Sequence, residues 1–550
     1  MKYKIDQLSK TSQISKDYHV NPLLAKVIEE KGLSLEAYQQ MINPRLIYHD
    51  FSLFTEGEMA LDRIQEAIEK KEKIVIYGDY DCDGILATSI LVQAFHELNI
   101  HVGFHIPNRF EDGYGLNVHR VEQMAEKGYN LIITVDNGIK AFEAVEKANE
   151  RGVDVIITDH HTFEGDDYPD ACAIVHPKLG DSYPMKEICG GFIAYKLAAA
   201  LLGHHDPYLY SLAAITTISD MMPLRDENRS VVKRSLAFMA EKHYPQLDLL
   251  LGNQRYSTTS IGFTIAPKIN AFGRLPEIVN PNNLVKFFQK DCPMRFMEAV
   301  SENAKKINTK RQSLTNAQYE EAMQEEHEHC LYYASENVHE GIIGLIAGKY
   351  TRTYEQPALV MHYDEESQTY KGSARGVNGF NIYKFFDAHK DLLIQFGGHA
   401  MAGGFSVAQS HFEDLHQALL KDIDGRDFNA EKVVIPVSFE ELTIDNVSSL
   451  EALEPYGQTN EQPLFILKDV TFDGLRQLSE GKHLRFDKTL EAGRFAALYF
   501  GKGDRYADYL DQELTMVGTL SINEYHGFKS VNMIIEEIVN DDDLEAQLKK

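Results

Sequence analysis

Short apolar runs alternate with amphipathic stretches between about residues 73 and 202. The runs are rich in Val and Ile and read KIVIYGD, HVGFHIP, NLIITVDNG, VDVIITDHH and ACAIVHP. Between them, stretches such as ATSILVQAFHELN and KAFEAVEKANERG repeat apolar residues at helical spacing. Strands that alternate with helices in this way predict right-handed βαβ units and a parallel sheet, whose ligands bind at the carboxyl ends of the strands.

The pattern changes three times after this region. Residues from about 211 to 288 look helical, with a predicted loop at TIAPKINAFGRLP. The stretch from Met294 to His329 lacks Gly and Pro, which predicts a long connecting helix. A second α/β unit is expected from about 330 to 422. From about 433 onward, short β-like segments separated by polar turns predict a small barrel of the OB type.

The chain is too long for a single hydrophobic core, so we expect several domains in its 550 residues. The expected parts are an N-terminal helical region (1–70), a catalytic α/β domain (71–290), a connecting helix (291–330), a smaller α/β domain (331–425), an OB-type β-barrel (433–540) and an acidic tail (541–550).

Composition narrows the possible classes of protein. Asp and Glu (83) outnumber Lys and Arg (55), which disfavours non-specific binding of nucleic acid along a broad basic face, although a metal site can still recruit a polyanion. The five cysteines form no CxxC pair, so we expect reduced thiols. No apolar run reaches the length of a membrane span and the N-terminus lacks the apolar core of a signal peptide, so we expect a cytoplasmic protein.

Acidic residues gather where the predicted strands end. The residues concerned are Asp79, Asp81, Asp83, Asp136, Asp159, His160, His161 and Asp220. So many carboxylates cannot all be ionised in one site unless cations neutralise them. Oxygen ligands with one or two imidazoles and no thiolate favour Mn²⁺ or Mg²⁺. Two such ions, about 3.5–4 Å apart, would catalyse hydrolysis of a phosphoester.

Each motif also has a simpler interpretation. A single Asp at a strand end is usually a helix N-cap or a turn residue, but five of them with a His pair favour a site. GGHAMAGG lacks the endings of known nucleotide-binding loops, so His399 within it either donates to a phosphate or lies in a tight turn. Ser373 and Arg375 of KGSARG form either a donor pair for an oxyanion or part of a surface loop.

Four ordered motifs, YGDYDCDG, TVDNG, TDHH and ISDMMPL, resemble those of the DHH phosphoesterase superfamily. The resemblance narrows to its RecJ-type single-stranded-DNA exonucleases through IPNRFEDGYGLN, IAPKINAFGRL, INTKRQ, HEGIIGLIAGKY, GSARG, FGGHAMAGGFS and LEPYGQTNEQPLF. It covers nearly the whole chain from residue 70. It implies a DHH catalytic domain, a DHHA1 substrate-binding domain after the long helix, and an OB-fold-like nucleic-acid-binding domain.

The resemblance also implies roles for particular residues. Two metal ions would be held by Asp79, Asp81, Asp83, Asp136, His160 and Asp220, with Asp136 as the bridging carboxylate. His161 would face the scissile phosphate and Asp159 would orient a neighbouring imidazole. Five further residues fall at substrate-facing positions, some of them gripping a terminal 5′ phosphate: Arg109, Arg274, Ser373, Arg375 and His399.

The leading hypothesis is therefore an Mn²⁺- or Mg²⁺-dependent 5′-to-3′ exonuclease that degrades single-stranded DNA to 5′-mononucleotides in recombination and repair. Its expected partners are a DNA strand with a 5′ end and, as the family implies, a single-strand-binding protein and a helicase, with no membrane. One alternative is a DHH-family phosphodiesterase for short oligonucleotides or cyclic dinucleotides. An alternative of another class is a non-catalytic, DNA-binding replication scaffold.

Overall fold

Five parallel strands form the sheet that the apolar runs predict, in the order β3-β2-β4-β5-β6. They are β2 (Ile74–Tyr77), β3 (Gly103–His105), β4 (Leu131–Val135), β5 (Asp154–Thr158) and β6 (Ala173–Val175). The register aligns Ile76 with Ile133 and Ile133 with Ile156, so the strands end close to one another at one edge. The expected parallel α/β architecture is confirmed.

The computed structural model describes residues 2–43, 45–113, 115–325, 327, 329–428, 431–491, 493–525 and 527–539. It divides into two units, each treated separately below. The larger contains Leu46–Phe428 and Gly457–Thr459, and the smaller contains the described parts of Met1–Arg45, Asn429–Tyr456 and Asn460–Lys550. The predicted acidic tail of 541–550 lies outside the described residues. Within those residues, no helix is both long and apolar enough to cross a bilayer.

Helices cover both faces of the parallel sheet. Alternate strand residues point to opposite faces, so Ile74 and Ile76 pack in one core while Val75 and Tyr77 pack in the other. The first core contains η1 (Phe51–Leu53), α4 (Gly57–Glu69), α5 (Cys82–Glu97) and α8 (Gly190–Leu202), and the second contains α6 (Val118–Glu126) and α7 (Phe142–Glu150). A strand buried on both faces explains why these runs are almost wholly apolar.

A helical layer extends the first core. It consists of α9 (Pro207–Ser219), α10 (Asp226–Lys242), α11 (Pro245–Leu251), α12 (Thr258–Ser260), the π-helical η2 (Ile261–Ile265), α13 (Ala266–Arg274) and α14 (Asn282–Phe287). The loop predicted at TIAPKINAFGRLP is wrong, because η2 and α13 occupy it. Pro267 lies in the first turn of α13, where a missing backbone N–H does not break a helix.

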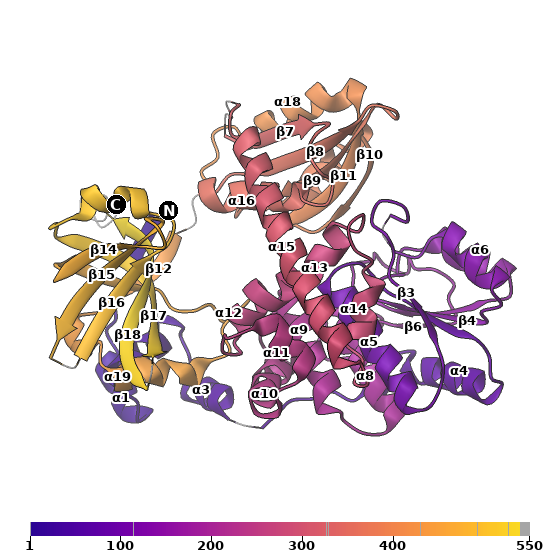
Figure 1. Ribbon diagram of the computed structural model, residues 1–550, viewed down its shortest axis with the longest axis horizontal. Helices are drawn as coiled ribbons and strands as arrows, with labels where there is room; N and C mark the ends of the chain where they lie inside the picture. The colour runs from indigo at the N-terminus through magenta and orange to yellow at the C-terminus, as the bar shows by residue number, and fades with distance from the viewer. Residues whose placement is uncertain are drawn as a thin grey trace. The chain divides into compact units, whose positions relative to one another are not determined.

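The long helix α15 (Met294–Ala322) leads to a second sheet (Figure 1). This sheet has the order β10-β11-β9-β8-β7, with β7 and β8 parallel and the other pairs antiparallel. Its strands are β7 (Leu331–Ser335), β8 (Ala358–Asp364), β9 (Thr369–Arg375), β10 (Leu393–Gly398) and β11 (Ala402–Ala408). Its helices are α16 (Ile343–Tyr354), α17 (Ile382–Ala388), η3 (Lys390–Leu392), η4 (Gln409–His411) and α18 (Phe412–Ile423).

The smaller unit is built on an eight-stranded sheet of order β1-β12-β13-β17-β18-β16-β15-β14. The strands are β1 (Lys2–Ile5), β12 (Glu431–Pro436), β13 (Phe465–Val470), β14 (Gly474–Leu478), β15 (His483–Leu490), β16 (Gly493–Tyr499), β17 (Leu514–Tyr525) and β18 (Phe528–Val539). Short helices accompany them: η5 (Phe439–Glu441), α19 (Ile444–Ser448), η6 (Ser449–Leu453), η7 (Gly503–Arg505) and α20 (Tyr506–Tyr509).

The N-terminal residues belong to the barrel rather than to a helical region of 1–70. Helices α1 (Thr11–Asp17), α2 (Pro22–Glu30) and α3 (Leu35–Ile42) follow β1, which pairs in parallel with β12. Leu23, Leu24 and Val27 of α2 are buried in the barrel core. The chain is divided after Arg45, and α4 packs in the larger unit. Sequence patterning missed this division because the pairing of β1 with β12 joins segments more than 400 residues apart.

A buried ion pair fixes the segment with which the chain enters the larger unit. Lys196 of α8 and Glu227 of α10 are both fully buried, with Nζ and Oε2 2.8 Å apart. The Lys196 ammonium also donates to the carbonyl of His49 at 2.6 Å and lies 3.7 Å from the ring centroid of Tyr48. Tyr183 donates its hydroxyl to the Glu227 carboxylate. One ammonium therefore joins α8, α10 and the segment before α4.

We expect Lys196→Met to lower the free energy of unfolding by about 3–5 kcal/mol, because it leaves Glu227 buried without its counter-ion. Guanidinium unfolding of the larger unit would measure the loss. The exposed Lys242 of the same helical layer provides the control, and Lys242→Met should change stability little. Lys196→Met combined with Glu227→Leu should recover part of the loss. A single variant as stable as the wild type would contradict this account.

Candidate active site

The acidic motifs meet at the carboxyl edge of the parallel sheet, as the sequence predicts. Asp79 follows β2, Asp136 follows β4, and Asp159 with His160 and His161 follows β5. Asp220 joins them from the C-terminal end of α9. Asp136 has a φ of 61°, a left-handed conformation that is uncommon for a residue with a side chain. The chain therefore turns sharply where this carboxylate enters the site.

The GDYDCDG segment begins α5. Asp81 is the N-cap of this helix, and its Oδ1 accepts from the backbone N–H groups of Asp83 (2.9 Å) and Gly84 (3.1 Å). Because a helix starts here, the carboxylates of Asp79, Asp81 and Asp83 point in different directions instead of to one side. Gly84 is needed for space rather than for backbone freedom, since a Cβ there would lie 2.5 Å from the backbone nitrogen of Asp79. Asp81 thus caps a helix and also lines the acidic cluster.

The N-terminus of α8 supports the same cluster. Backbone N–H groups of Gly190 and Gly191 donate to the two oxygens of Asp83, each at 2.7 Å. A Cβ on Gly190 would lie 2.6 Å from the Cβ of Asp136, so only glycine fits between the helix and this carboxylate. Sequence reasoning missed these glycines. The signal that could have found them is the pair GG directly before a helical run.

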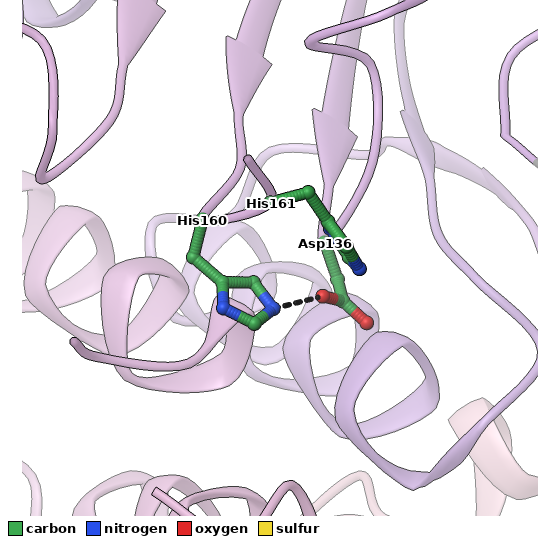
Figure 2. A group of neighbouring side chains, drawn as sticks. All are labelled: Asp136, His160 and His161. Carbon is green, nitrogen blue, oxygen red and sulfur yellow. Dashed lines mark hydrogen bonds and ion pairs between the residues drawn. The ribbon is translucent and has the colours of Figure 1, made fainter. Parts of the chain in front are cut away.

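His160 lies next to three of the carboxylates, and Figure 2 shows its contact with one of them, Asp136. Its Nε2 lies 3.1 Å from Asp136 Oδ1 and 3.7 Å from the nearest oxygens of Asp83 and Asp220. Burial, together with the positive charge of His161, lowers the pKa of His160 well below its usual value. A neutral imidazole surrounded by carboxylates offers a lone pair to a metal ion.

Asp159 fixes the other histidine. One of its oxygens accepts from His161 Nδ1 at 2.7 Å and from the backbone N–H groups of His160 and His161, while the second accepts from Ile139 N–H at 3.0 Å. Burial would raise its pKa, but His161 and these donors hold the pKa of Asp159 below its usual value. Burial alone would lower the pKa of His161, yet the Asp159 carboxylate raises it to about 9. This carboxylate orients an imidazole and is not itself available to a cation.

The remaining carboxylates repel one another. Burial and the charge of Asp81 raise the pKa of Asp79 to about 8 and that of Asp83 to about 6. Burial and the charge of Asp83 also raise the pKa values of Asp136 and Asp220. Without cations, this set of groups stays partly protonated at neutral pH.

The residues fit a pair of divalent ions. Asp79 Oδ1 and Asp220 Oδ2 are buried without a hydrogen bond among the described residues, which points to ligands that the polypeptide does not supply. Three sets have donor atoms within 4.8 Å of one another: Asp136, His160 and His161; Asp83, His160 and Asp220; Asp79, Asp81 and Asp136. Asp136 and His160 each belong to two of these sets. For Asp136, this position suits a carboxylate that bridges two ions. Glu97, His204 and Asp206 also have donor atoms within this distance of one another. Their two carboxylates need no metal ion to balance their charge, because Lys290 already pairs with both.

Arginines from both α/β domains gather beside this acidic cluster. Arg109, in the segment after β3, lies 5.3 Å from the ring centroid of Tyr80, and Arg274 at the end of α13 donates to the carbonyl of Gly341 at 3.1 Å. Burial and the charges of Arg109, Arg311 and Arg375 lower the pKa of Arg274. Burial raises the pKa of Tyr80, the charges of Arg109 and Arg274 lower it, and those of Asp79 and Asp81 raise it. Tyr80 therefore lies within electrostatic range of both the basic and the acidic groups.

Arg375 and Ser373 complete what we call the arginine pocket, formed by Arg109, Arg274, Arg311, Ser373 and Arg375. Arg375 Nη1 donates to Ser373 Oγ at 3.0 Å and to the carbonyl of Ala374 at 2.8 Å. Among the described residues, none of these arginines forms an ion pair with a carboxylate. Such a group of uncompensated guanidinium groups is a site for an anion such as phosphate. Arg311 was not predicted, although it lies in the quoted motif INTKRQ.

His399 lies in the turn between β10 and β11, where its backbone N–H donates to the carbonyl of Ala402, the residue aligned with Arg375 in β9. Burial lowers the pKa of His399, and the charges that add to this effect are those of His161, Lys178 and Lys140. It therefore lies within electrostatic range of His161 and of two lysines that sequence reasoning did not single out.

Three protein-family models match this chain. They are the DHH family, N-terminal domain (residues 73–219), the DHHA1 domain (327–425) and the RecJ OB domain (435–537). The fold and the acidic site are thus those of a DHH-class phosphoesterase, and the expected OB-type barrel is confirmed.

Relatives that match most of this chain identify its family within this class. The chain is 32% identical over 553 residues to the single-stranded-DNA-specific exonuclease RecJ of Bacillus subtilis, covering 96% of this chain and 69% of that one. It is 30% identical over 482 residues to RecJ of Thermus thermophilus, covering 84% and 68%. The crystal structure of Thermus thermophilus RecJ in complex with Mn²⁺ superposes with a TM-score of 0.81 at 26% identity, covering 98% and 79%. The chain belongs to the RecJ family.

We expect Mn²⁺ binding to release roughly one proton at pH 7, because the ion must displace protons from carboxylates of raised pKa such as Asp79. In the metal-free protein these groups bind more protons folded than unfolded. Stability without metal therefore falls as pH rises from about 4 to 8, while the affinity for Mn²⁺ rises with pH.

Isothermal titration of Mn²⁺ in buffers of different ionisation enthalpy measures the released proton. Asp79→Asn removes the group and should reduce both the proton count and the affinity. The exposed Asp170 of the same domain gives the matched control, Asp170→Asn. Heats that do not depend on the buffer would contradict the raised pKa values.

Proposed function

We propose that this chain is a metal-dependent exonuclease that hydrolyses single-stranded DNA from its 5′ end and releases 5′-mononucleotides. The observation that carries the proposal is the arginine pocket beside the acidic cluster, where Arg109 lies 5.3 Å from the ring centroid of Tyr80 and its charge also acts on Asp79. An anion pocket next to a hydrolytic centre suits an enzyme that holds a terminal phosphate and cuts the neighbouring linkage. The names of the RecJ relatives agree with this substrate.

The acidic residues have separate roles in this proposal. Asp79, Asp81, Asp83, Asp136, His160 and Asp220 would hold two Mn²⁺ or Mg²⁺ ions, with Asp136 shared between them. When bound, the ions supply Lewis acidity to the attacking and leaving oxygens of the phosphoester. His161, kept protonated by Asp159, would bring a positive charge and a donor N–H to the scissile phosphate.

The arginine pocket would set the direction of degradation. Guanidinium groups of Arg109, Arg274 and Arg375, with the hydroxyl of Ser373, would bind a 5′ phosphate through charge-assisted hydrogen bonds. A phosphomonoester carries more negative charge than an internal linkage, so such a pocket would favour a strand end. His399 would contact the substrate from the histidine side of the site.

In the cell, we place this activity in DNA recombination and repair in the cytoplasm. A single-strand-binding protein and a helicase that exposes 5′ ends would be its partners. The RecJ family membership supports these assignments.

The assay that tests the proposal offers long single strands labelled at the 5′ or 3′ end, the corresponding duplex and a dinucleotide, each with Mn²⁺ and with a chelator. We expect metal-dependent release of labelled mononucleotide from the 5′ end of the single strand. Cleavage of the dinucleotide alone would favour the alternative of a short-oligonucleotide phosphodiesterase. Binding of the strand without degradation would favour a non-catalytic scaffold.

Asp136→Ala should abolish nuclease activity, with a loss of at least about 10³-fold, because it removes a carboxylate shared by two ligand sets. Initial rates on the 5′-labelled strand measure this effect. Circular dichroism and the thermal midpoint should stay close to wild type, and Asp170→Ala serves as the control. Wild-type rates in Asp136→Ala would refute the two-metal assignment.

Arg274→Ala and Arg375→Ala should lose the preference for a 5′-phosphorylated end over a 5′-hydroxyl end by about tenfold or more, because each removes a charged hydrogen bond. Competition between the two kinds of strand measures the ratio of kcat/KM. Arg295→Ala, on the exposed start of α15, is the control. An unchanged preference in both variants would place the end-binding pocket elsewhere.

A further inference from the structure

Lys178 lies at the opposite edge of the catalytic sheet from Arg109. The strand order β3-β2-β4-β5-β6 places the Arg109 segment after the edge strand β3, the metal-binding residues after β2, β4 and β5, and Lys178 after the other edge strand, β6. The side chain reaches back toward the centre, since Lys178 Nζ donates to the carbonyl of His160 at 3.3 Å. Cationic side chains thus lie on both sides of the acidic cluster.

Buried His176 anchors the backbone of Lys178 to the loop that carries His160 and His161. The backbone N–H of Lys178 donates to His176 Nδ1 at 3.0 Å, so the ring proton is on Nε2, which donates to the carbonyl of His161 at 2.9 Å. His176 is fully buried, and the ring of Phe163 packs edge-on against it at 4.9 Å between centroids. The position of Lys178 is therefore fixed relative to the metal-binding residues.

Among the described residues, no carboxylate forms an ion pair with the ammonium group of Lys178. Lys178 is an exposed residue. The burial that remains lowers its pKa, and the two carboxylates whose charges counter this effect are those of Asp159 and Glu187. Asp159 is occupied by His161 and by backbone N–H groups, and Glu187 pairs with Arg225. On the side of the second α/β domain, the facing group is His399, whose environment also includes Lys140. Among the described residues, this corner of the site is cationic and lacks a counter-ion.

We propose that Lys178 binds the phosphate on the 3′ side of the scissile linkage, so that the DNA strand crosses the carboxyl edge of the sheet from β3 toward β6. This inference rests on the proposed function. If the terminal phosphate occupies the arginine pocket and the scissile phosphate occupies the metal centre, the next phosphate continues in the same direction. Four strand spacings of about 4.8 Å separate β3 from β6, which leaves room for more than one linkage along the edge.

A structural role for Lys178, in which it only supports the His160 loop, makes different predictions. The test measures first-nucleotide release in single turnovers for the wild type, Lys178→Ala and Lys178→Arg. Lys186→Ala is the matched control, because Lys186 lies nearby in sequence and donates to the carbonyl of Gly180. Loss of one phosphate contact should lower kcat/KM about tenfold and reduce the slope of log kcat/KM against log salt by about 0.7. Lys178→Arg should retain most of the activity.

A substrate change tests the same contact without relying on a variant that folds. A strand with one uncharged methylphosphonate at the second linkage from the 5′ end should be processed by the wild type about as slowly as Lys178→Ala processes the normal strand. Combining the two changes should add little further loss, whereas a methylphosphonate at the fifth linkage should have no effect on the first turnover. Affinity for Mn²⁺ and the preference for a 5′ phosphate should be unchanged in Lys178→Ala.

The outcomes separate the two claims. A wild type that releases no nucleotide from 5′ ends would overturn the proposed function and this inference together. If the wild type is active but Lys178→Ala has the same salt slope as the wild type, the position of Lys178 alone is overturned. The same holds if the effects of the variant and of the methylphosphonate are fully additive.

Discussion

Repulsion among buried carboxylates is the constraint on which the rest of this structure depends. Asp79, Asp83 and Asp136 are buried at one edge of the parallel sheet, with little water to screen their charges, and the partly buried Asp220 joins them. The polypeptide compensates only part of this charge. Two amides at the start of α8 hold Asp83, and a glycine at that position lets the helix approach Asp136. The uncompensated remainder makes the site selective for small, highly charged cations.

The two adjacent histidines differ in protonation state because their surroundings differ. His161 bonds to an ionised Asp159 and stays protonated, while His160 is buried among carboxylates whose own pKa values are raised. Neighbouring residues of identical chemistry are thus a cationic donor and a neutral imidazole. The difference arises from Asp159, whose oxygens already accept from His161 and from backbone N–H groups and are not available to a metal ion.

The catalytic sheet and the acidic cluster could be predicted from sequence because both follow local rules. Apolar runs buried on both faces are distinctive, and carboxyl ends of parallel strands share one edge. Other features depend on contacts between distant segments. The approach of Gly190 to Asp136, the pairing of β1 with β12 and the meeting of Arg274 with Gly341 leave no local trace. The segment TIAPKINAFGRLP, predicted as a loop, is instead the end of η2 and all of α13. Its sequence does not decide between the two, because Pro267 is compatible with either a loop or the first turn of a helix.

The ring of Tyr80 has a consequence for how the two halves of the site respond to their ligands. The charges of Arg109 and Arg274 on one side of the site, and those of Asp79 and Asp81 on the other, all act on its hydroxyl. In the proposed function, cations bound by the acidic cluster and an anion bound by the arginine pocket would attract each other over this short range. Their binding is therefore thermodynamically linked, and the factor by which bound ions tighten phosphate binding equals the factor by which phosphate tightens the binding of ions. In the proposed function, a bound strand end would therefore also raise the occupancy of the metal site.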